Sequence, residues 1–146
     1  MLKQALANIT KENHSTILRR SAGIPPTIIA ILRAEPNIIK ANRSHNKKWG
    51  VEKKCDETVL LNQTLDFLLD VASKTTRDDS KIHALNIMKF IFSDAYLRQD
   101  VRAYITRAMM LSMDEFSSDN WSIRNSALMC FTALIKRLLN DFHIQE

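Results

Sequence analysis

The sequence predicts an all-α fold, because it is poor in turn-forming residues, rich in apolar residues and periodic at helical spacing. The 146 residues include only 2 glycines and 3 prolines, whereas sheet proteins and open loops use both residue types at their turns. Apolar residues make up 45% of the chain, which is enough for a sizeable core in one domain over residues 1–146. We therefore expect helices joined by short connections.

Two helices are expected first, over about 2–12 and 15–33. Along the second, apolar residues recur on one face at helical steps. Pro25 and Pro26 conflict with this pattern, because a proline inside a helix removes a hydrogen bond and clashes with the preceding turn. A proline costs little in the first turn of a helix. We therefore predict a kink or short break near Gly23 and Ile24, with a new helical segment starting at Pro25 or Pro26.

Four more helices are expected after a long connection, over about 57–73, over 81–92, from about 94 and from about 121. Ser93 is the candidate N-cap of the third of these, and Ser118 and Asp119 are the candidates for the last. The helix over 81–92 is apolar nearly all round, with a narrow polar strip through His83 and Asn86, so it must be covered on two sides. One-sided helices alternate with more deeply buried ones, which is typical of a two-layer stack of hairpins.

Three segments of the chain share one residue pattern. LRRSAGIPPTIIAIL, KIHALNIMKFI and IRNSALMCFTALIKR align on a common alanine, at Ala22, Ala84 and Ala127. The interval between the last two alanines is close to the roughly 40 to 47 residues of HEAT and armadillo repeats. The pattern predicts an α-solenoid of about three such helical hairpins, with the long connection accounting for the wider first interval.

Positive charge is concentrated in that connection. The formal net charge is +5, and residues 37–54 hold six lysines and arginines against one acid, Glu52. We treat 37–56 as a basic insertion or linker. Either it is a solvated insertion or it contacts phosphates, and the candidates for phosphate contact are Lys47, Lys48, Lys53 and Lys54.

The sequence carries no catalytic, metal or membrane signature. It has no nucleophile motif, glycine-rich nucleotide loop or metal-ligand spacing. Cys55 and Cys130 are far apart, without CxxC or Cys/His spacing, so neither a disulfide framework nor a zinc site is expected. No apolar run approaches the roughly 20 residues that span a bilayer, and no signal peptide is evident. We expect a cytoplasmic protein that is not an enzyme and uses no cofactor or membrane.

Three blocks, RRSAGIPPTIIAILRAEP, KIHALNIMKFIFSDAYL and SSDNWSIRNSALMCFTALIKR, resemble the central conserved domain of the thyroid adenoma-associated protein family, also called death-receptor-interacting protein, and its fungal counterparts. Their order and approximate spacing match over about 17–137. The chain departs from the family at Pro26, where an aromatic or other apolar residue is more usual, and in its more basic linker. Full members are far longer, so we expect a fragment of a longer solenoid with further helical repeats beside it.

The resemblance implies a non-catalytic scaffold or regulator. Family members associate with an FtsJ-type methyltransferase and enable its 2′-O-methylation of the tRNA anticodon loop, and the partner holds the S-adenosylmethionine site. This chain would then meet tRNA through the complex. One motif is important for the modification in the family, and the residues that match it here are Arg19, Arg20, Ser21, Ala22, Gly23, Ile24 and Pro25.

The repeat alignment separates the two arginines of this motif. Arg19 corresponds to Arg124, so its alternative role is a structural bond between repeats. Arg20 corresponds to Asn125, which leaves it as the contact candidate. Gly23 and Thr27 lie on its side of the helix and leave a strip that suits a phosphate or a partner carboxylate. Alternatively, Gly23 and the prolines only fit a tight helix crossing.

Secondary contact candidates come from the polar strip of the 81–92 helix and the start of the last helix: His83, Asn86, Trp121, Arg124 and Asn125. The alternatives are an ordinary hydrogen-bonded role for His83 and a packing role for Trp121. Two other functional classes remain open: a helical module that binds RNA directly, through Arg20 and the basic insertion, and a generic protein-interaction solenoid.

Overall fold

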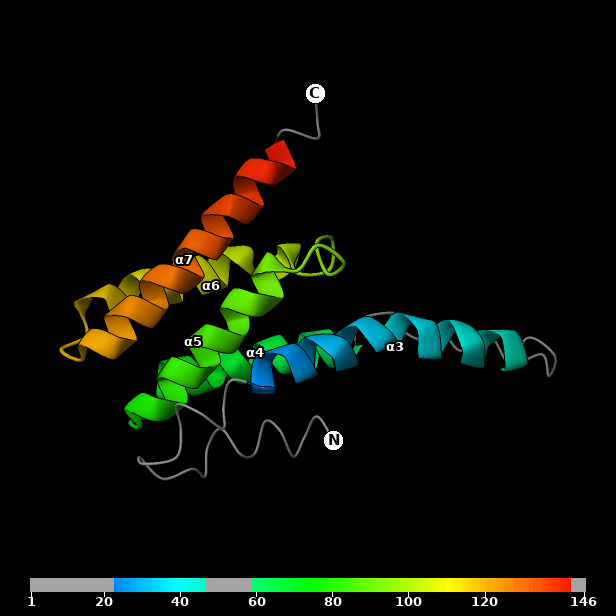
Figure 1. Cartoon of the computed structure of the whole chain (residues 1–146), viewed down its shortest axis with the longest axis horizontal. Helices are drawn as coiled ribbons and strands as arrows, with labels where there is room; N and C mark the ends of the chain where they lie inside the picture. The colour runs from blue at the N-terminus through cyan, green and yellow to red at the C-terminus, as the bar shows by residue number, and fades with distance from the viewer. Residues whose placement is uncertain (1–22, 47–58, 143–146) are drawn as a thin grey trace.

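The structure, a computed structural model, describes residues 23–46 and 59–142, with the side chains of 23–35 and 59–140. Within these residues every regular element is helical (Figure 1), which confirms the all-α class. The α-helices are α3 (Ile24–Asn46), α4 (Val59–Lys74), α5 (Asp78–Ser93), α6 (Ile105–Asp114) and α7 (Trp121–Phe142), and two short 3₁₀ turns are η3 (Arg102–Tyr104) and η4 (Glu115–Ser117). The helix expected over 2–12 lies outside the described residues.

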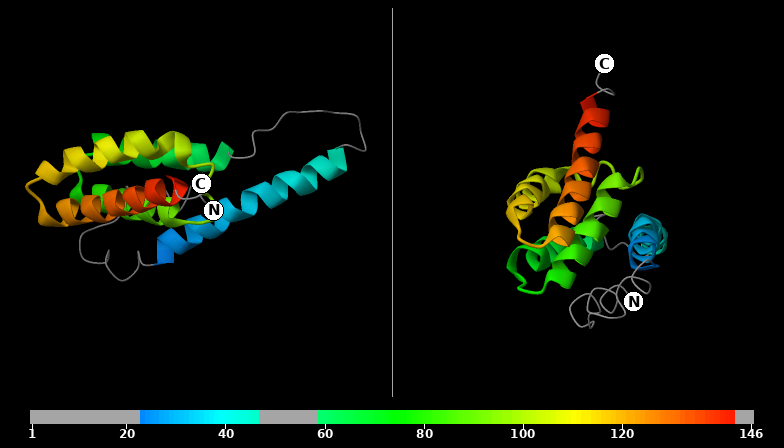
Figure 2. Two further views of the ribbon diagram at one scale, coloured as in Figure 1. Left: turned by 90° about the horizontal axis from the view of Figure 1, so that it is seen from above. Right: turned by 60° about the vertical axis from the view of Figure 1, so that its left-hand side comes forward.

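The helices form two layers, with α3, α5 and α7 in one and α4 and α6 in the other (Figure 2). Contacts at both ends show that α5 and α7 run parallel. Near their starts, the Asn120 amide donates to Asp78 at 2.7 Å. Near their ends, Arg137 Nε donates to the Phe92 carbonyl at 2.8 Å. Because α5 packs against α3, α4 and α7, it is the central element of the described structure.

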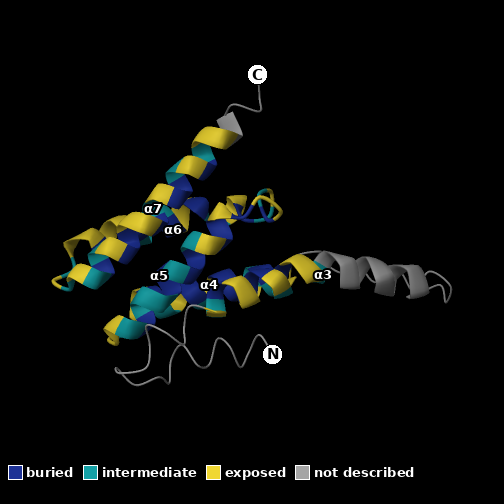
Figure 3. Cartoon of the chain, in the orientation of Figure 1, coloured by how far each residue is buried: buried dark blue, intermediate teal, exposed yellow. Residues whose placement is uncertain are grey.

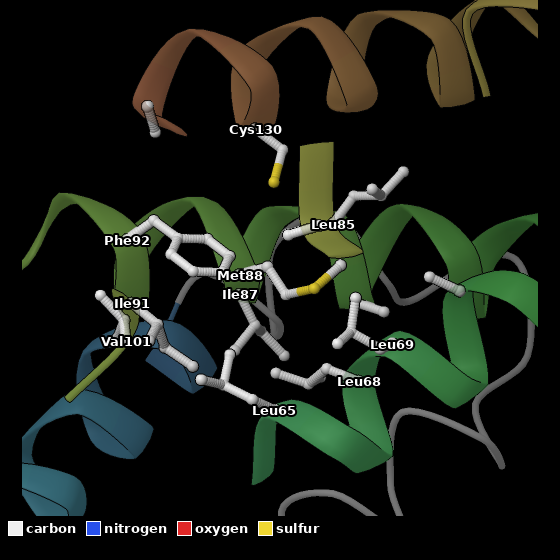
Figure 4. Close-up of a cluster of buried hydrophobic side chains, with 14 of the residues drawn as sticks. Leu65, Leu68, Leu69, Leu85, Ile87, Met88, Ile91, Phe92, Val101 and Cys130 are labelled. Carbon is white, nitrogen blue, oxygen red and sulfur yellow. The ribbon is translucent and has the colours of Figure 1, made fainter. Parts of the chain in front are cut away.

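The core is centred on α5, and its buried apolar residues point both toward α4 and toward α7 (Figure 4). They are Ala84, Leu85, Ile87, Met88, Ile91 and Phe92. Each large apolar side chain of this kind contributes about 1.5–3 kcal/mol when it is fully buried. The prediction that this helix is covered on two sides is therefore confirmed. Ala84 and Ala127, which the repeat alignment pairs, are both fully buried, as a close approach of α5 and α7 requires.

The two prolines lie in the first turn of α3. This helix starts at Ile24, so the missing N–H groups of Pro25 and Pro26 belong to positions that have no intrahelical partner in any helix. The predicted start of a helical segment is confirmed. The predicted end near Arg33 is wrong, because α3 continues to Asn46. Pro36 removes only the bond to the Leu32 carbonyl, and the helix passes through it.

The predicted start of the next helix at about 94 is also wrong. Ser93 is the last residue of α5, and its hydroxyl donates to the Lys89 carbonyl at 2.8 Å instead of capping a following helix. Residues 94–101 form turns, and α6 begins at Ile105. Asp94 holds the chain in this turn, because its Oδ1 accepts the N–H groups of Tyr96 at 2.9 Å and Leu97 at 3.3 Å.

The N-cap of α7 differs from the two candidates. Asn120 caps the helix, since its Oδ1 accepts the N–H of Ser122 at 2.8 Å. Ser118 lies one step earlier, where its hydroxyl accepts the N–H of Asn120 at 3.4 Å. Both Ser118 and Asp119 belong to the connection that precedes the cap.

Asp94 connects α3 to the turn that follows α5. Its Oδ2 accepts two hydrogen bonds from Arg33, from Nε at 2.9 Å and from Nη2 at 2.5 Å. The carboxylate is almost fully buried, whereas the Arg33 side chain is half exposed. The hydrogen bond to Asp94 raises the pKa of the Arg33 guanidinium. The buried carboxylate thus has a charged partner and two backbone donors, which offset the cost of its desolvation.

Arg137 reaches the same turn from α7. Its Nη2 donates to the carbonyls of Phe92 at 2.6 Å and Asp94 at 2.5 Å. The last carbonyls of a helix lack intrahelical partners and carry the negative end of the helix dipole, so a buried guanidinium stabilises the C-terminus of α5. The connection after α5 is therefore attached to α3 through Asp94 and to α7 through Arg137.

We predict that Asp94→Asn lowers the free energy of unfolding by about 1–3 kcal/mol, because an NH2 donor replaces the oxygen that accepts from Arg33 and the bonds from two backbone N–H groups are no longer charge-assisted. Urea denaturation followed by circular dichroism measures the change. Asp70→Asn is the matched control, since its carboxylate pairs with Lys74 on the exposed face of α4 and an exposed pair of this kind contributes only about 0.3–0.5 kcal/mol. Equal losses in the two variants would contradict the role assigned to Asp94.

Candidate partner-binding site

The described part of the family motif opens α3. Gly23 is exposed, Ile24 is half-buried against the core, and Pro25 is buried. The motif therefore changes from an exposed to a buried position within one turn of helix. The remaining motif residues, Arg19, Arg20, Ser21 and Ala22, lie outside the described residues, as do Lys47, Lys48, Lys53 and Lys54.

Gly23 and Thr27 form the described part of the predicted strip. Both are exposed, and the Thr27 hydroxyl donates to the Gly23 carbonyl at 2.7 Å. Among the described residues, no atom lies within 4 Å of a Cβ atom added at Gly23. The contact strip and the tight helix crossing both stay predictions, because residues 1–22 lie outside the described residues.

The secondary candidates do not gather around this strip. His83 and Asn86 are half-buried on α5, and Trp121, Arg124 and Asn125 lie on α7, with α5 between α7 and α3 (Figure 1). Trp121 is 68% exposed, so the packing role considered for it is not what the structure shows. Asn125 is also exposed. The start of α7 is thus a separate surface.

Arg124 has a structural role within its own hairpin. Its Nη1 donates to the carbonyls of Ser118 at 2.6 Å and Asp119 at 2.9 Å, both in the connection between α6 and α7. The sequence predicted that an arginine at this position bonds to an adjacent repeat. The observed acceptors are local instead, because the preceding connection folds back over the first turn of α7.

An open groove lies between α4 and α6, and the sequence did not predict it. Its floor is apolar and its rim is charged, and the lining residues are Leu69, Asp70, Ser73, Lys74, Arg107, Met110, Leu111 and Asp114. Arg107 Nη1 contacts Asp66 at 2.8 Å, and the Tyr104 hydroxyl donates to the same carboxylate at 3.2 Å. Burial, with the charge of Asp66, raises the pKa of Tyr104. These contacts join α4 to α6 beside the groove.

Sequence reasoning also missed the exposed ring of Tyr96. It lies in the turn after α5, where the Arg33 guanidinium stands 4.6 Å from the ring centroid. The two residues are far apart in the chain and share no periodic pattern. The one local signal that could have indicated the turn is Asp94, two residues before Tyr96, because an aspartate in a turn often bonds the backbone two residues further on.

Metal and membrane sites were searched for in the described part of the chain. No three His, Cys, Asp or Glu side chains there lie close enough to hold a metal ion. None of the helices in that part is both long and apolar enough to cross a bilayer. Cys130 is buried in the core, where desolvation raises the pKa of its thiol to about 11, although a hydrogen bond with Ser112 opposes the shift.

The described helices form two layers, and the start of α3 is exposed. These features define an all-helical protein whose helix faces are exposed on its surface. Residues 1–122 match the family described as THADA/TRM732, DUF2428, and the chain belongs to this family. The resemblance found in the sequence blocks is thereby confirmed.

Relatives at about one-third identity cover most of the chain. The tRNA (32-2′-O)-methyltransferase regulator THADA of Gallus gallus is 33% identical over 82% of the chain and 6% of its own length. The regulator trm732 of Schizosaccharomyces pombe is 33% identical over 89% of the chain and 8% of its own length. Mus musculus THADA is 32% identical over 94% of the chain and 6% of its own length. The chain thus spans less than a tenth of these relatives. No solved structure is similar enough to count as a match.

We predict that Cys130 stays protonated and unreactive in the folded chain. In a Cys55→Ser variant, Cys130 is the only thiol, and a thiol reagent at pH 8 should label it only after unfolding. From about pH 9, the ordinary value, to about pH 11, the unfolded thiol loses its proton while the folded thiol keeps it. The free energy of unfolding should therefore fall as the pH rises through this window.

The pH dependence can be isolated by repeating the denaturation series with Cys130→Ala in the same background. Other groups titrate identically in both chains, so the difference between the two curves reports this thiol. A native Cys130 that is labelled as fast as an unfolded one would contradict its burial.

Proposed function

We propose that this chain is part of a non-catalytic scaffold through which an FtsJ-type partner carries out 2′-O-methylation of the tRNA anticodon loop. The relatives are named as regulators of a tRNA 2′-O-methyltransferase, which supports a regulatory role. The observation that carries the proposal is the exposed strip formed by Gly23 of the family motif and by Thr27, one helical turn further on. In this proposal the partner binds S-adenosylmethionine and the complex acts in the cytoplasm.

We further propose that the helices are part of a HEAT- or armadillo-like α-solenoid of about three hairpins. The parallel α5 and α7, with α3 beside them and α4 and α6 behind, have the layered order that stacked hairpins produce. Ala84 and Ala127 occupy equivalent places in the alignment and are both fully buried. Further repeats of a longer protein would extend this stack.

The roles of the two motif arginines follow from their counterparts on α7. Arg124 is committed to the carbonyls of its own hairpin, which supports a structural role for Arg19. Asn125 is exposed, which supports a contact role for Arg20, whose planar guanidinium suits a phosphate or carboxylate.

This assignment predicts different effects for the two arginines. Arg19→Ala should lower the melting temperature, as Arg124→Ala should, because Arg124 bonds the carbonyls of the connection before α7 and Arg19 is its counterpart in the repeat alignment. Arg20→Ala should leave the melting temperature nearly unchanged but reduce co-purification of the methyltransferase and methylation of tRNA position 32, measured by mass spectrometry of digested tRNA. Equal thermal effects of Arg19→Ala and Arg20→Ala would remove the distinction.

A second candidate function is direct RNA binding through the basic insertion. The observation that favours it is the length of α3, which continues past Arg33 and projects beyond the other helices (Figure 1). The first part of the basic stretch, with Lys40 and Arg43, is therefore on a helix and not in an open loop.

Neutralising Lys47, Lys48, Lys53 and Lys54 together tests this candidate. If these residues contact phosphates, the slope of log affinity for tRNA against log salt concentration should decrease by up to about 0.7–0.9 for each lost contact. A control that neutralises two exposed lysines elsewhere, Lys74 on α4 and Lys136 on α7, gives the change of slope for each charge lost outside the insertion. An unchanged slope would show that the insertion is solvated, and loss of the methyltransferase at unchanged tRNA affinity would make it a protein-docking element.

A further inference from the structure

The turn after α5 presents an aromatic ring in a defined position. Tyr96 is 79% exposed, yet its backbone N–H donates to Asp94 Oδ1 at 2.9 Å. The Arg33 guanidinium lies 4.6 Å from the ring centroid. In Figure 3 this turn contains exposed, intermediate and buried residues. A large apolar side chain that is exposed to this degree but attached at its backbone is available for a ligand.

The cation beside the ring is itself held in place. Arg33 forms two hydrogen bonds with Asp94, at 2.9 and 2.5 Å, and Asp94 is buried. One face of the Tyr96 ring therefore lies against a positioned guanidinium, and its high exposure leaves the opposite face open. Aromatic rings that stack nucleobases in single-stranded nucleic acids have this geometry, and a neighbouring arginine adds cation–π attraction.

Arginines lie around the turn, which itself carries the acids Asp94 and Asp100. Arg98 lies two residues after Tyr96, and its Nη2 donates to the Asn140 carbonyl at 2.8 Å, near the end of α7. Arg137 contacts the turn from the same helix. The guanidinium groups of Arg33, Arg98 and Arg137 thus contact the turn or the end of α7 beside it. Arg33 is the one that is paired with the buried Asp94. A phosphate backbone would be attracted to this surface.

The residues beside Tyr96 favour RNA over a protein as the ligand. Arg98, Gln99 and Asp100, which follow Leu97 in the same turn, are polar or charged, whereas the centre of a protein-docking surface is depleted in charge. The relatives are named for modification of a tRNA nucleotide, and proteins recognise RNA sequence mainly in single-stranded loops, where bases can be splayed out.

We propose that Tyr96 is a stacking site for an unpaired RNA base, with Arg98 placed to contact an adjacent phosphate. This site rests on the proposed function in one respect, the choice of tRNA as the RNA. It is separate from the family motif, since it lies at the C-terminal end of α5 and not at the start of α3.

The test measures binding of the full chain to an anticodon stem-loop RNA by fluorescence anisotropy. Tyr96→Ala should weaken binding by about 5- to 150-fold, the range found when a stacked aromatic ring is removed. Tyr96→Trp should retain the affinity, because it keeps a π-face. The salt dependence of Tyr96→Ala should match that of the unaltered chain, whereas Arg98→Gln should reduce the slope by up to about 0.9.

Phe90→Ala is the matched control. Phe90 is also an exposed aromatic residue, at 43%, with a cation, Lys89 Nζ, 4.9 Å from its ring centroid. It is on α5 and not in the turn, so its removal should leave stem-loop affinity unchanged. A fully paired RNA duplex is the matched ligand, and Tyr96→Ala should bind it as the unaltered chain does. Circular dichroism confirms that each variant is folded.

Three outcomes would overturn the stacking site: unchanged stem-loop affinity in Tyr96→Ala, equal losses in Tyr96→Ala and Phe90→Ala, or no RNA binding by the unaltered chain. Loss of the methyltransferase from Tyr96→Ala at unchanged RNA affinity would make Tyr96 a protein contact. Conversely, if the unaltered chain binds the stem-loop through Tyr96 but does not co-purify with a methyltransferase, the stacking site stands and the proposed scaffold function fails.

Discussion

The buried carboxylate of Asp94 is the interaction on which the arrangement of the described helices depends. A charge removed from water must be paired, and here the partners come from two places: Arg33 on α3, and the N–H groups of Tyr96 and Leu97 in the turn. Arg137 from α7 satisfies the neighbouring carbonyls. Because one short connection meets donors from both sides of α5, the positions of α3 and α7 relative to α5 are set at the same point. Apolar burial along α5 supplies most of the stability, while these polar contacts select one arrangement of the helices.

The strip at Gly23 and Thr27 and the ring of Tyr96 are both in contact with α3, the first as part of its start and the second through Arg33. The exposed strip at Gly23 and Thr27 lies at the start of this helix, and Arg33 positions the ring of Tyr96. Along the helix axis, Arg33 lies about 9 Å from Thr27 at 1.5 Å per residue. Between them, Ile28, Ile29 and Leu32 anchor the helix in the core. The family motif and the turn after α5 are thus linked by one anchored helix. A ligand that engages both would meet them at a set separation and orientation.

In the repeat pattern, one polar position has a structural role and the position after it is exposed. Arg124 closes its own hairpin on the carbonyls of Ser118 and Asp119, and the next residue, Asn125, is exposed. A helical repeat can therefore keep one polar residue for internal bonding while its neighbour is free to vary for function. In the first copy of the pattern that second position is Arg20, in the motif that the family resemblance connects with tRNA modification.

The sequence by itself determined the helical class, the two-sided burial of α5 and the start of α3 at its proline pair, because apolar periodicity and proline chemistry act over a few residues. It also led to the family, through blocks that include the motif residues.

The sequence did not determine the end of α3, the start of α6 or the ring position of Tyr96. A helix start at 94 was reasonable from local propensity, but Arg33, 61 residues away in the chain, pairs with the Asp94 carboxylate while that carboxylate binds two N–H groups of a turn. Likewise, the sequence does not determine the exposure of Gly23, which is exposed among the described residues. Contacts between residues distant in the chain are set by tertiary packing, so they leave no period in the sequence from which they could be predicted.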